Sequence, residues 1–257
     1  MVVEPFIGST KLWAQKGMEA ATANIYTGLH EFNEMGFLLH FLQPEDIFVD
    51  VGANIGAYTI LASGVIGARS ISMEPVPTTF DILLKNIELN GIEDKVLALN
   101  IGVGSEESSL YFTDNKDSSN HVVLNINKDE AGLIKVHTNT LVKILLNEQC
   151  PSLLKIDVEG FEQEVINGAS KIMENQKLKA VIIELIGEGK RYGFNEENIH
   201  LQLLKYNFSP YQYFPFDRKI STVPGHRTSS TIYMRDINFI KMRIGNAKPI
   251  YVFSEYF

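Results

Sequence analysis

Acidic residues stand at the ends of three apolar runs in this chain, where they could bind a polyhydroxylated or cationic ligand. Asp50 ends the first run, Glu74 ends the second, and Asp157 and Glu159 end the third. If these runs are parallel strands, their carboxyl ends meet at one edge of the sheet, where open α/β sheets bind ligands. The sequence therefore predicts a polar binding site at that edge.

A glycine-containing turn follows Asp50 and predicts the class of ligand. Gly52 and Gly56 remove side chains where a ligand must touch the backbone, and Asn54 tolerates a left-handed conformation. The helix expected after Gly56 presents free N–H groups. Dinucleotide enzymes use G-x-G-x-x-G, and this glycine triple is missing. A carboxylate at Asp50 would repel a pyrophosphate but attract the ammonium of a methionine, which favours S-adenosylmethionine.

The second acid supports a nucleoside cofactor. Glu74 follows the turn by about twenty residues, where an acid accepts hydrogen bonds from ribose hydroxyls. NAD would satisfy the same acid. Asn100, after the third expected strand, is placed either to approach an adenine or to form a turn before Gly102. The predicted cofactor-binding residues are Asp50, Gly52, Asn54, Gly56, Thr59, Glu74, Asn100 and Asp157.

Alternating strand and helix patterns must position these residues. A helical pattern ends before Pro44, and from there to residue 186 short apolar runs alternate with amphipathic segments. This order is typical of an α/β fold, with a mostly parallel sheet, expected to have seven strands, and helices on both faces. "TIYMR" and "NFIKM" predict a C-terminal antiparallel hairpin. We expect an N-terminal extension over 1–25 and one domain over 26–257.

Composition indicates which classes of partner and which cellular compartment are expected. The 257 residues are 45% hydrophobic with a formal net charge of −8, and no stripe of Lys or Arg is present, which disfavours nucleic acid. No apolar run approaches the roughly 20 residues of a membrane span, and no secretion signal is visible. With Cys150 as the single cysteine, a cytoplasmic protein without internal disulfides is expected. The oligomeric state stays open.

Four segments together resemble the FkbM family of S-adenosylmethionine-dependent methyltransferases. They are "FVDVGANIGAYTI", "MEPVPTTFDILLKNIELNG", "LLKIDVEGFEQEVINGA" and "VIIEL", and the resemblance extends from about Tyr26 to Ile186. It implies a class I methyltransferase (Rossmann-like) fold and O-methylation of a hydroxyl on a sugar, a glycan or a small natural product. Val142 stands where the family tends to have an aspartate, so any role of that aspartate is absent.

Methyl transfer to a hydroxyl needs alignment and a base. Lys155, Asp157 and Glu159 alternate along one strand end and should share a face that borders the cleft. We predict Asp157 as the base, with His121 as the second candidate. Glu159 is expected to organise the following loop, and Glu184 to orient the acceptor hydroxyl.

Other interpretations stay open at this point. Asp157, Glu159 and Glu184 could bind Mg²⁺, although their spacing does not select a metal and no metal ligand is predicted. Aromatic residues and Arg218 in 208–227, together with "SSNHVV", are expected to form the acceptor wall. Besides the methyltransferase, a nicotinamide-dependent oxidoreductase and a non-catalytic binding protein with this fold are the alternatives.

Overall fold

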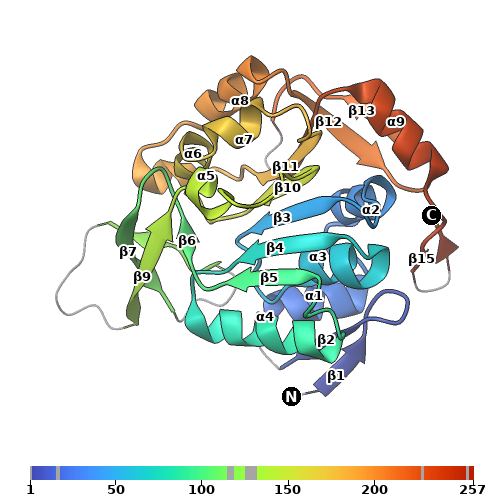
Figure 1. The fold of residues 1–257 in the computed structure, drawn as a ribbon, viewed down its shortest axis with the longest axis horizontal. Coiled ribbons are helices and arrows are strands. Elements are labelled where there is room, and N and C mark those ends of the chain that lie inside the picture. Colours follow the sequence, from blue (N-terminus) through green and yellow to red (C-terminus); the bar gives the residue numbers. More distant parts are fainter. Residues whose placement is uncertain (1, 16–17, 115–118, 125–131, 227–228, 253–254) are drawn as a thin grey trace.

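The computed structural model describes residues 2–15, 18–114, 119–124, 132–226, 229–252 and 255–257. Its centre is a twisted sheet with helices on both sides (Figure 1). Among the helices of these residues, none has the length and apolar character needed to cross a membrane. The predicted α/β fold is confirmed.

The central sheet has eight strands in the order β13-β12-β14-β11-β10-β3-β4-β5. Five neighbouring strands are parallel: β3 (Ile47–Val51), β4 (Arg69–Met73), β5 (Val96–Leu99), β10 (Leu153–Ile156) and β11 (Ala180–Glu184). Three antiparallel strands complete the β11 side: β12 (Ser209–Phe214), β13 (Lys219–Thr222) and β14 (Ser230–Met234). The strand order reverses between β3 and β10, which is where Rossmann-like sheets bind their ligands.

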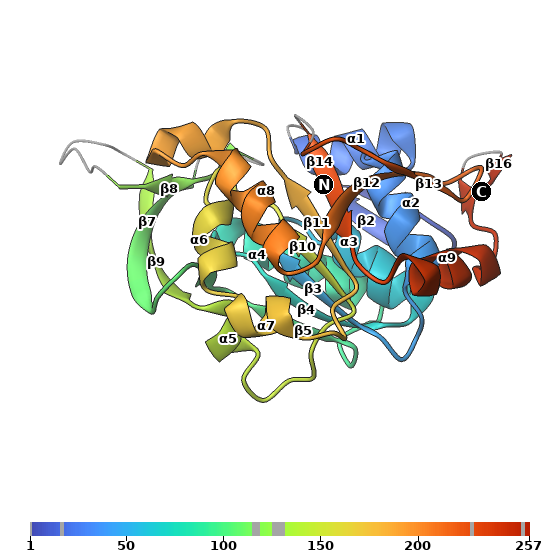
Figure 2. The ribbon, with the colours of Figure 1, turned by 90° about the horizontal axis from the view of Figure 1, so that it is seen from above.

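Two apolar layers enclose this sheet, because its buried strands point successive side chains to opposite faces. Phe48 packs with α2 (Phe32–Phe41), α3 (Ala57–Ile60) and α9 (Ile237–Asn246). Val49 packs on the other face, against helices that Figure 2 shows grouped together: α5 (Leu141–Ile144), α6 (Glu162–Asn167), α7 (Ser170–Glu174) and α8 (Glu196–Lys205). A π-helical segment, Leu61–Ile66, continues α3.

The N-terminal residues form a small hairpin of β1 (Val2–Pro5) and β2 (Lys11–Ala14), followed by α1 (Glu19–Thr27). The hairpin is held by one asparagine of α4 (Pro77–Leu89) and by the asparagine at the C-cap of that helix. Asn86 Oδ1 accepts a hydrogen bond from Trp13 N at 2.7 Å, and the Asn90 amide bonds both backbone groups of Lys11. The division expected between residues 25 and 26 falls within α1 and stays a prediction.

A second sheet stands beside the carboxyl ends of the parallel strands (Figure 1). Its strands, in spatial order, are β6 (Gly102–Val103), β9 (Leu133–Asn139), β7 (Ser108–Thr113) and β8 (Val122–Val123). Phe112 and Val122 of this sheet pack against Phe161, which precedes α6. It includes the predicted strand "SSLYFT", and it places new side chains at the edge where the predicted site lies.

The sequence-based prediction was wrong at two points near the C-terminus. The sheet has eight strands rather than seven, since residues 209–222 form the hairpin β12–β13. "NFIKM" is part of helix α9, in which Ile240 and Ile244 are buried at the i, i+4 spacing of a helix. The expected antiparallel strand "TIYMR" does form as β14, but it pairs with β11 and β12. A short hairpin of β15 (Tyr251–Val252) and β16 (Glu255–Tyr256) ends the chain.

Candidate functional site

The turn after β3 brings main chain against main chain. Gly52 has φ +78°, and a Cβ atom there would lie 1.8 Å from the carbonyl oxygen of Asp157. Asn54 adopts φ +51° and Gly56 φ +92°, so the turn uses three left-handed residues in five positions. The N–H groups of Gly52 and Ala53 both donate to the carbonyl oxygen of Met73. No side chain larger than a hydrogen atom fits at Gly52, because the main chain of Asp157 occupies the space that a Cβ would need.

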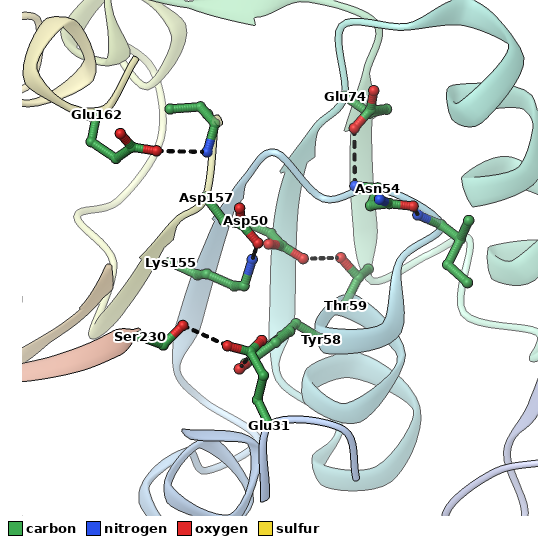
Figure 3. A network of polar contacts seen from close by, with 12 residues as sticks. Glu31, Asp50, Asn54, Tyr58, Thr59, Glu74, Lys155, Asp157, Glu162 and Ser230 are labelled. Carbon is green, nitrogen blue, oxygen red and sulfur yellow. Dashed lines mark hydrogen bonds and ion pairs between the residues drawn. The ribbon is translucent and has the colours of Figure 1, made fainter. Parts of the chain in front are cut away.

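Glu74 supports this turn from the end of β4 (Figure 3). Its Oε2 accepts the Asn54 N–H at 3.0 Å, and its Oε1 accepts the Val76 N–H at 2.9 Å. Burial raises the pKa of Glu74 to about 7, although both backbone hydrogen bonds oppose that rise. The carboxylate is therefore fixed in orientation by the backbone before any ligand binds.

Asp50 lies below the turn and does not line a cavity, unlike the predicted contact with a ligand ammonium. The residue is 1% exposed, and its Oδ2 accepts a hydrogen bond from Thr59 Oγ1 at 2.8 Å. Its Oδ1 is buried without a hydrogen-bond partner among the described residues. Burial raises the pKa of Asp50, and the nearby Lys155 opposes this. Asp50 and Thr59 thus tie the start of α3 to the sheet.

The side-chain amide of Asn100 binds the backbone, whereas one of the two predictions for it was an approach to an adenine. Its Nδ2 donates to the carbonyl oxygens of Glu74 at 2.8 Å and Pro75 at 3.0 Å. Since these carbonyls follow β4, the amide fixes the segment that carries Glu74. Asn100 supports the site through Glu74.

The first of two cavities at the sheet edge is lined mainly by apolar side chains, and we call it the apolar cavity. Glu74 and the Gly52–Asn54 turn form one wall, and the second sheet forms another. Its apolar lining consists of Val51, Met73, Pro75, Ile101, Val103, Phe112, Val122, Val158 and Phe161. Its lining combines apolar side chains with the carboxyl group of Glu74, as sites for a heterocycle with a hydroxylated neighbour do.

The second cavity, which we call the acidic cavity, lies on the other side of the same turn. Four carboxylates line it, from Glu31, Asp157, Glu159 and Glu184, together with Lys155. Its remaining lining is Ala23, Asn24, His30, Met35, Gly52, Ala53, Asn54, Ile55, Ala57 and Tyr58. The two cavities share Gly52, Asn54, Asp157 and Glu159, so they meet at the turn and the end of β10.

A buried ion pair forms the floor of the acidic cavity. Lys155 Nζ lies 2.8 Å from Asp157 Oδ2, and Figure 3 shows the lysine directed toward Asp157. Burial alone would lower the pKa of Lys155, but the carboxylates of Asp157, Asp50 and Glu31 outweigh it and raise the pKa. Lys155 therefore stays protonated, and Asp157 is an ion-paired carboxylate.

The predicted cluster of Asp157, Glu159 and Glu184 does form. One carboxylate oxygen from each lies within 4.8 Å of the others. Burial, and then the charge of Asp157, raise the pKa of Glu159 to about 7 and that of Glu184 to about 8. Such pairs of acids with separated pKa values can hold and release a proton near neutral pH.

Glu162 makes the loop contacts that the sequence analysis expected of Glu159. Its Oε1 accepts the N–H groups of Val158 at 3.2 Å and Gly160 at 3.1 Å. The sequence signal for this was present, because Glu162 is in the first turn of an expected helix, where acids bind free N–H groups. Glu159 is consequently left free to face the acidic cavity.

Glu31 and Tyr58 are cavity residues that the sequence analysis missed. Tyr58 of α3 donates to Glu31 Oε2 at 2.9 Å, and Ser230 of β14 donates to Glu31 Oε1 at 2.5 Å (Figure 3). Glu31 precedes α2 and lies outside every motif. No local pattern marked it, because its partners are 27 and 199 residues away.

Two predicted parts of the acceptor site lie elsewhere. Asn120 and Val122 line the apolar cavity, whereas His121 between them does not, and its Nδ1 lies 2.9 Å from the Ser119 carbonyl oxygen. The aromatic residues of 208–227 belong to the far edge of the sheet, where Tyr213 is buried with its hydroxyl 2.6 Å from His40 Nδ1. Arg218 donates to backbone carbonyls of the last turn of α9 and of Ala247, which follows it. Ser118, also in the predicted wall, is outside the described residues.

The turn and the two acids fall within a region with known relatives. Residues 50–210 match the sequence profile of the methyltransferase FkbM domain. The chain belongs to this family. The predicted resemblance is thereby confirmed, the fold is that of a Rossmann-like class I methyltransferase, and the cofactor is S-adenosylmethionine.

Curated relatives match over about half of the chain. "Hexuronic acid methyltransferase AglP" of Haloferax volcanii is 28% identical over 158 residues, covering 58% of this chain and 59% of the relative. "Methyltransferase sdnD" of Sordaria araneosa is 30% identical over 162 residues, covering 51% and 62%. The chain thus spans about three fifths of the length of these relatives.

Solved structures resemble this chain at low sequence identity. Precorrin-6y C5,15-methyltransferase from Geobacter metallireducens GS-15 superimposes with a TM-score of 0.49 at 11% identity, covering 90% of this chain and 98% of that one. TrmK of M. capricolum, in complex with S-adenosylhomocysteine, gives a TM-score of 0.41 at 11% identity, with 79% and 68% coverage.

The residues of the apolar cavity fit S-adenosylmethionine. Gly52 and Glu74 both line the cavity, and Glu74 can accept hydrogen bonds from two vicinal hydroxyls. Phe112 and Phe161 offer apolar contact for a purine. The ammonium of the methionine part must find its partners at the shared wall, since Asp50 is covered.

Proposed function

We propose that the protein methylates a hydroxyl group of a sugar or a small natural product, with S-adenosylmethionine in the apolar cavity and the acceptor in the acidic cavity. The observation that carries this proposal is the wall that both cavities share at Gly52, Asn54, Asp157 and Glu159. Two adjoining cavities of different character bring two reactants together, which is what a transfer reaction requires.

On the donor side, the chain binds and orients. Glu74 would accept the ribose hydroxyls with a carboxylate that Asn54 and Val76 already hold in place. The Gly52 backbone would contact the amino-acid part of the cofactor. When bound, S-adenosylmethionine supplies a methyl group on a positively charged sulfur, so the protein need not activate it further.

On the acceptor side, we assign the proton to Glu184. As the new O–CH₃ bond forms and the S–CH₃ bond breaks, the acceptor hydroxyl loses its proton, and Glu184 takes it. Glu184 has a pKa of about 8 and accepts no hydrogen bond from the part of the chain that the structure describes. A base with a pKa near the working pH is the most effective. Asp157, the base expected from the sequence, is instead paired with Lys155 and orients this group.

Lys155 bears on the alternative of a metal-assisted reaction. Its ammonium, 2.8 Å from Asp157, supplies positive charge where Mg²⁺ would otherwise approach the three acids. The charges of Asp157, Asp50 and Glu31 raise the pKa of Lys155, so this cation stays in place beside the three acids. The proposal therefore needs no step at a metal.

The relatives support a sugar as the acceptor. AglP is named a hexuronic acid methyltransferase, and this chain aligns with about three fifths of it. A cavity lined by carboxylates and a tyrosine is also suited to accept hydrogen bonds from a polyol.

Transfer of labelled methyl from S-adenosylmethionine to a panel of sugars tests the proposal. We expect one methyl per acceptor, at oxygen, by mass spectrometry. Glu184→Gln should reduce turnover by about 10²-fold or more with unchanged S-adenosylhomocysteine affinity, since it removes the base but not the donor cavity. Glu174→Gln, at an exposed position on α7, is the matched control. Thermal stabilisation by NAD and not by S-adenosylhomocysteine would refute the donor assignment.

A further inference from the structure

We propose that the acidic cavity selects an acceptor in which a protonated amine neighbours the reacting hydroxyl, as in an amino sugar, and disfavours a carboxylate-bearing sugar. This inference rests on the proposed function for the location of the acceptor. The proposed acceptor differs from the hexuronic acid in the name of the relative AglP.

The charges that line the cavity are strongly unequal. Glu31, Asp157, Glu159 and Glu184 contribute four carboxyl groups, against one lysine and His30. The lysine is not available to an incoming anion, because its Nζ lies 2.8 Å from Asp157 Oδ2 and the side chain is only 6% exposed. A carboxylate on the acceptor would therefore meet further carboxyl groups, and among the described lining residues the lysine is not free to pair with it.

A fifth carboxyl group lies below the cavity. Asp50 pairs in register with Lys155 on adjacent parallel strands, so both side chains leave the same face of the sheet. Asp50 is 1% exposed, and its Oδ1 has no hydrogen-bond partner among the residues described. Burial raises the pKa of Asp50, so this group holds its proton more strongly than an exposed aspartate does, and it offers no positive charge to an acceptor.

Two carboxyl groups at the mouth have oxygen atoms to offer. Neither Glu159 nor Glu184 accepts a hydrogen bond from the described residues, whereas both oxygens of Glu31 are engaged by Tyr58 and Ser230. One oxygen each from Asp157, Glu159 and Glu184 lies within 4.8 Å of the others. An ammonium group has three N–H donors that can reach such a set, and these charge-assisted hydrogen bonds are stronger than those to a neutral hydroxyl.

The same cluster also holds protons when no cation is bound. Burial and mutual repulsion raise the pKa of Glu159 to about 7 and that of Glu184 to about 8. The cations near them are Lys155 on the cavity floor and Arg191, which is paired with Glu188 beside Glu159. An amine that binds here replaces these protons, so its binding should release protons into the buffer.

The test compares three hexoses that differ in one group: glucosamine, glucose and glucuronate. Each is titrated calorimetrically into the full chain, with and without S-adenosylhomocysteine, at a pH below the pKa of the amine. We expect glucosamine to bind about tenfold or more tightly than glucose, and glucuronate to bind weakest. Glu159→Gln and Glu184→Gln should each remove most of that preference, and Glu174→Gln should keep it.

Other results would overturn the inference. Equal affinities for glucosamine and glucose, or tighter binding of glucuronate, would show that the carboxylates do not select charge. Saturable binding of MgCl₂ that the same glutamine variants abolish, without a preference for glucosamine, would show that the cluster holds a metal ion. S-adenosylhomocysteine affinity is measured in the same titrations, so a failure of the donor site is distinguished from a failure of the acceptor preference.

Discussion

The apolar and acidic cavities share a wall, yet their acids are held in different ways. Glu74 in the apolar cavity accepts two backbone N–H groups, as does Glu162 near the wall. Glu159 and Glu184 in the acidic cavity accept none from the described chain, and Asp157 depends on one lysine. Backbone hydrogen bonds fix a carboxylate in one position and one role. Burial raises the pKa values of acids in both cavities, to about 7 for Glu74 and Glu159 and about 8 for Glu184, so the difference between the cavities is in how each carboxyl group is oriented.

The strongest test of the shared wall is Gly52→Ala. The new Cβ would lie 1.8 Å from the Asp157 carbonyl oxygen, in addition to the strain of φ +78°, so both cavities must deform. We expect a loss of about 3 kcal/mol or more in the free energy of unfolding and of measurable S-adenosylhomocysteine binding. Urea denaturation and calorimetry measure these.

Gly91→Ala is the matched control for Gly52→Ala. Gly91 also has a positive φ, +61°, but its Cβ would meet nothing within 4 Å. Gly91→Ala should lose only about 1 kcal/mol of the free energy of unfolding, from backbone strain, and should bind S-adenosylhomocysteine normally. If the two variants behaved alike, the close approach of the two backbones would not matter to the site.

Lys155→Met should affect the acidic cavity most. It leaves Asp157, Asp50 and Glu31 around a site without a cation, and removal of one partner of a buried ion pair costs about 3 kcal/mol. The double variant Lys155→Met/Asp157→Asn should recover part of this loss, as measured by urea denaturation of all four proteins. Additive effects in this cycle would contradict the coupling of the two residues.

Glu74→Gln tests the backbone-held acid of the apolar cavity. The amide would place an NH₂ group against a backbone N–H, so we expect about tenfold weaker binding of S-adenosylhomocysteine by calorimetry. Glu88 is exposed on the helix that follows Glu74, and the control variant Glu88→Gln should bind S-adenosylhomocysteine normally. Unchanged affinity in Glu74→Gln would remove Glu74 from the donor site.

The smallest expected effect is on the pH dependence of stability. The pKa of Glu184 is raised from 4.5 to about 8 in the folded protein. Its contribution to stability is therefore complete below pH 4.5 and is lost as the pH rises through 8. Glu184→Gln should remove that loss. Relative to the wild type, the free energy of unfolding of the variant should therefore rise by about 1 kcal/mol at the upper end of this range. Parallel stability curves in urea for the two proteins would contradict the raised pKa.

The sequence predicted more of the residues around the glycine turn than of those that line the acidic cavity, for a physical reason. Gly52, Asn54 and Glu74 act through the backbone of their own segments, and their types follow from local conformation. The acidic cavity instead includes Glu31, which reaches Tyr58 and Ser230 across the fold. Contacts of that range leave no periodic pattern in the sequence.

The positions of Asp50 and of the aromatic segment were not predicted, and the two cases have a related origin. Strand position predicted that Asp50 ends a strand, but not that the turn would cover it, leaving it 1% exposed. Residues 208–227 are aromatic because they complete a sheet edge around Tyr213, and composition alone does not separate a core from a binding wall. His121 lies between two residues that line the apolar cavity. A shift of one residue in register moves a side chain to the opposite face of a strand, and the sequence does not give this register.

The contact of Gly52 with the Asp157 carbonyl oxygen bears on how acceptor preference can change over time. The wall between the two cavities includes this contact of peptide groups, and exchange of the side chains at positions 31 or 184, which line the acidic cavity and not the apolar one, does not move it. New acceptors could be recruited by substitutions on one side while the methyl group stays aligned. For engineering, this makes the acidic side the one to randomise and the glycine turn the one to leave intact.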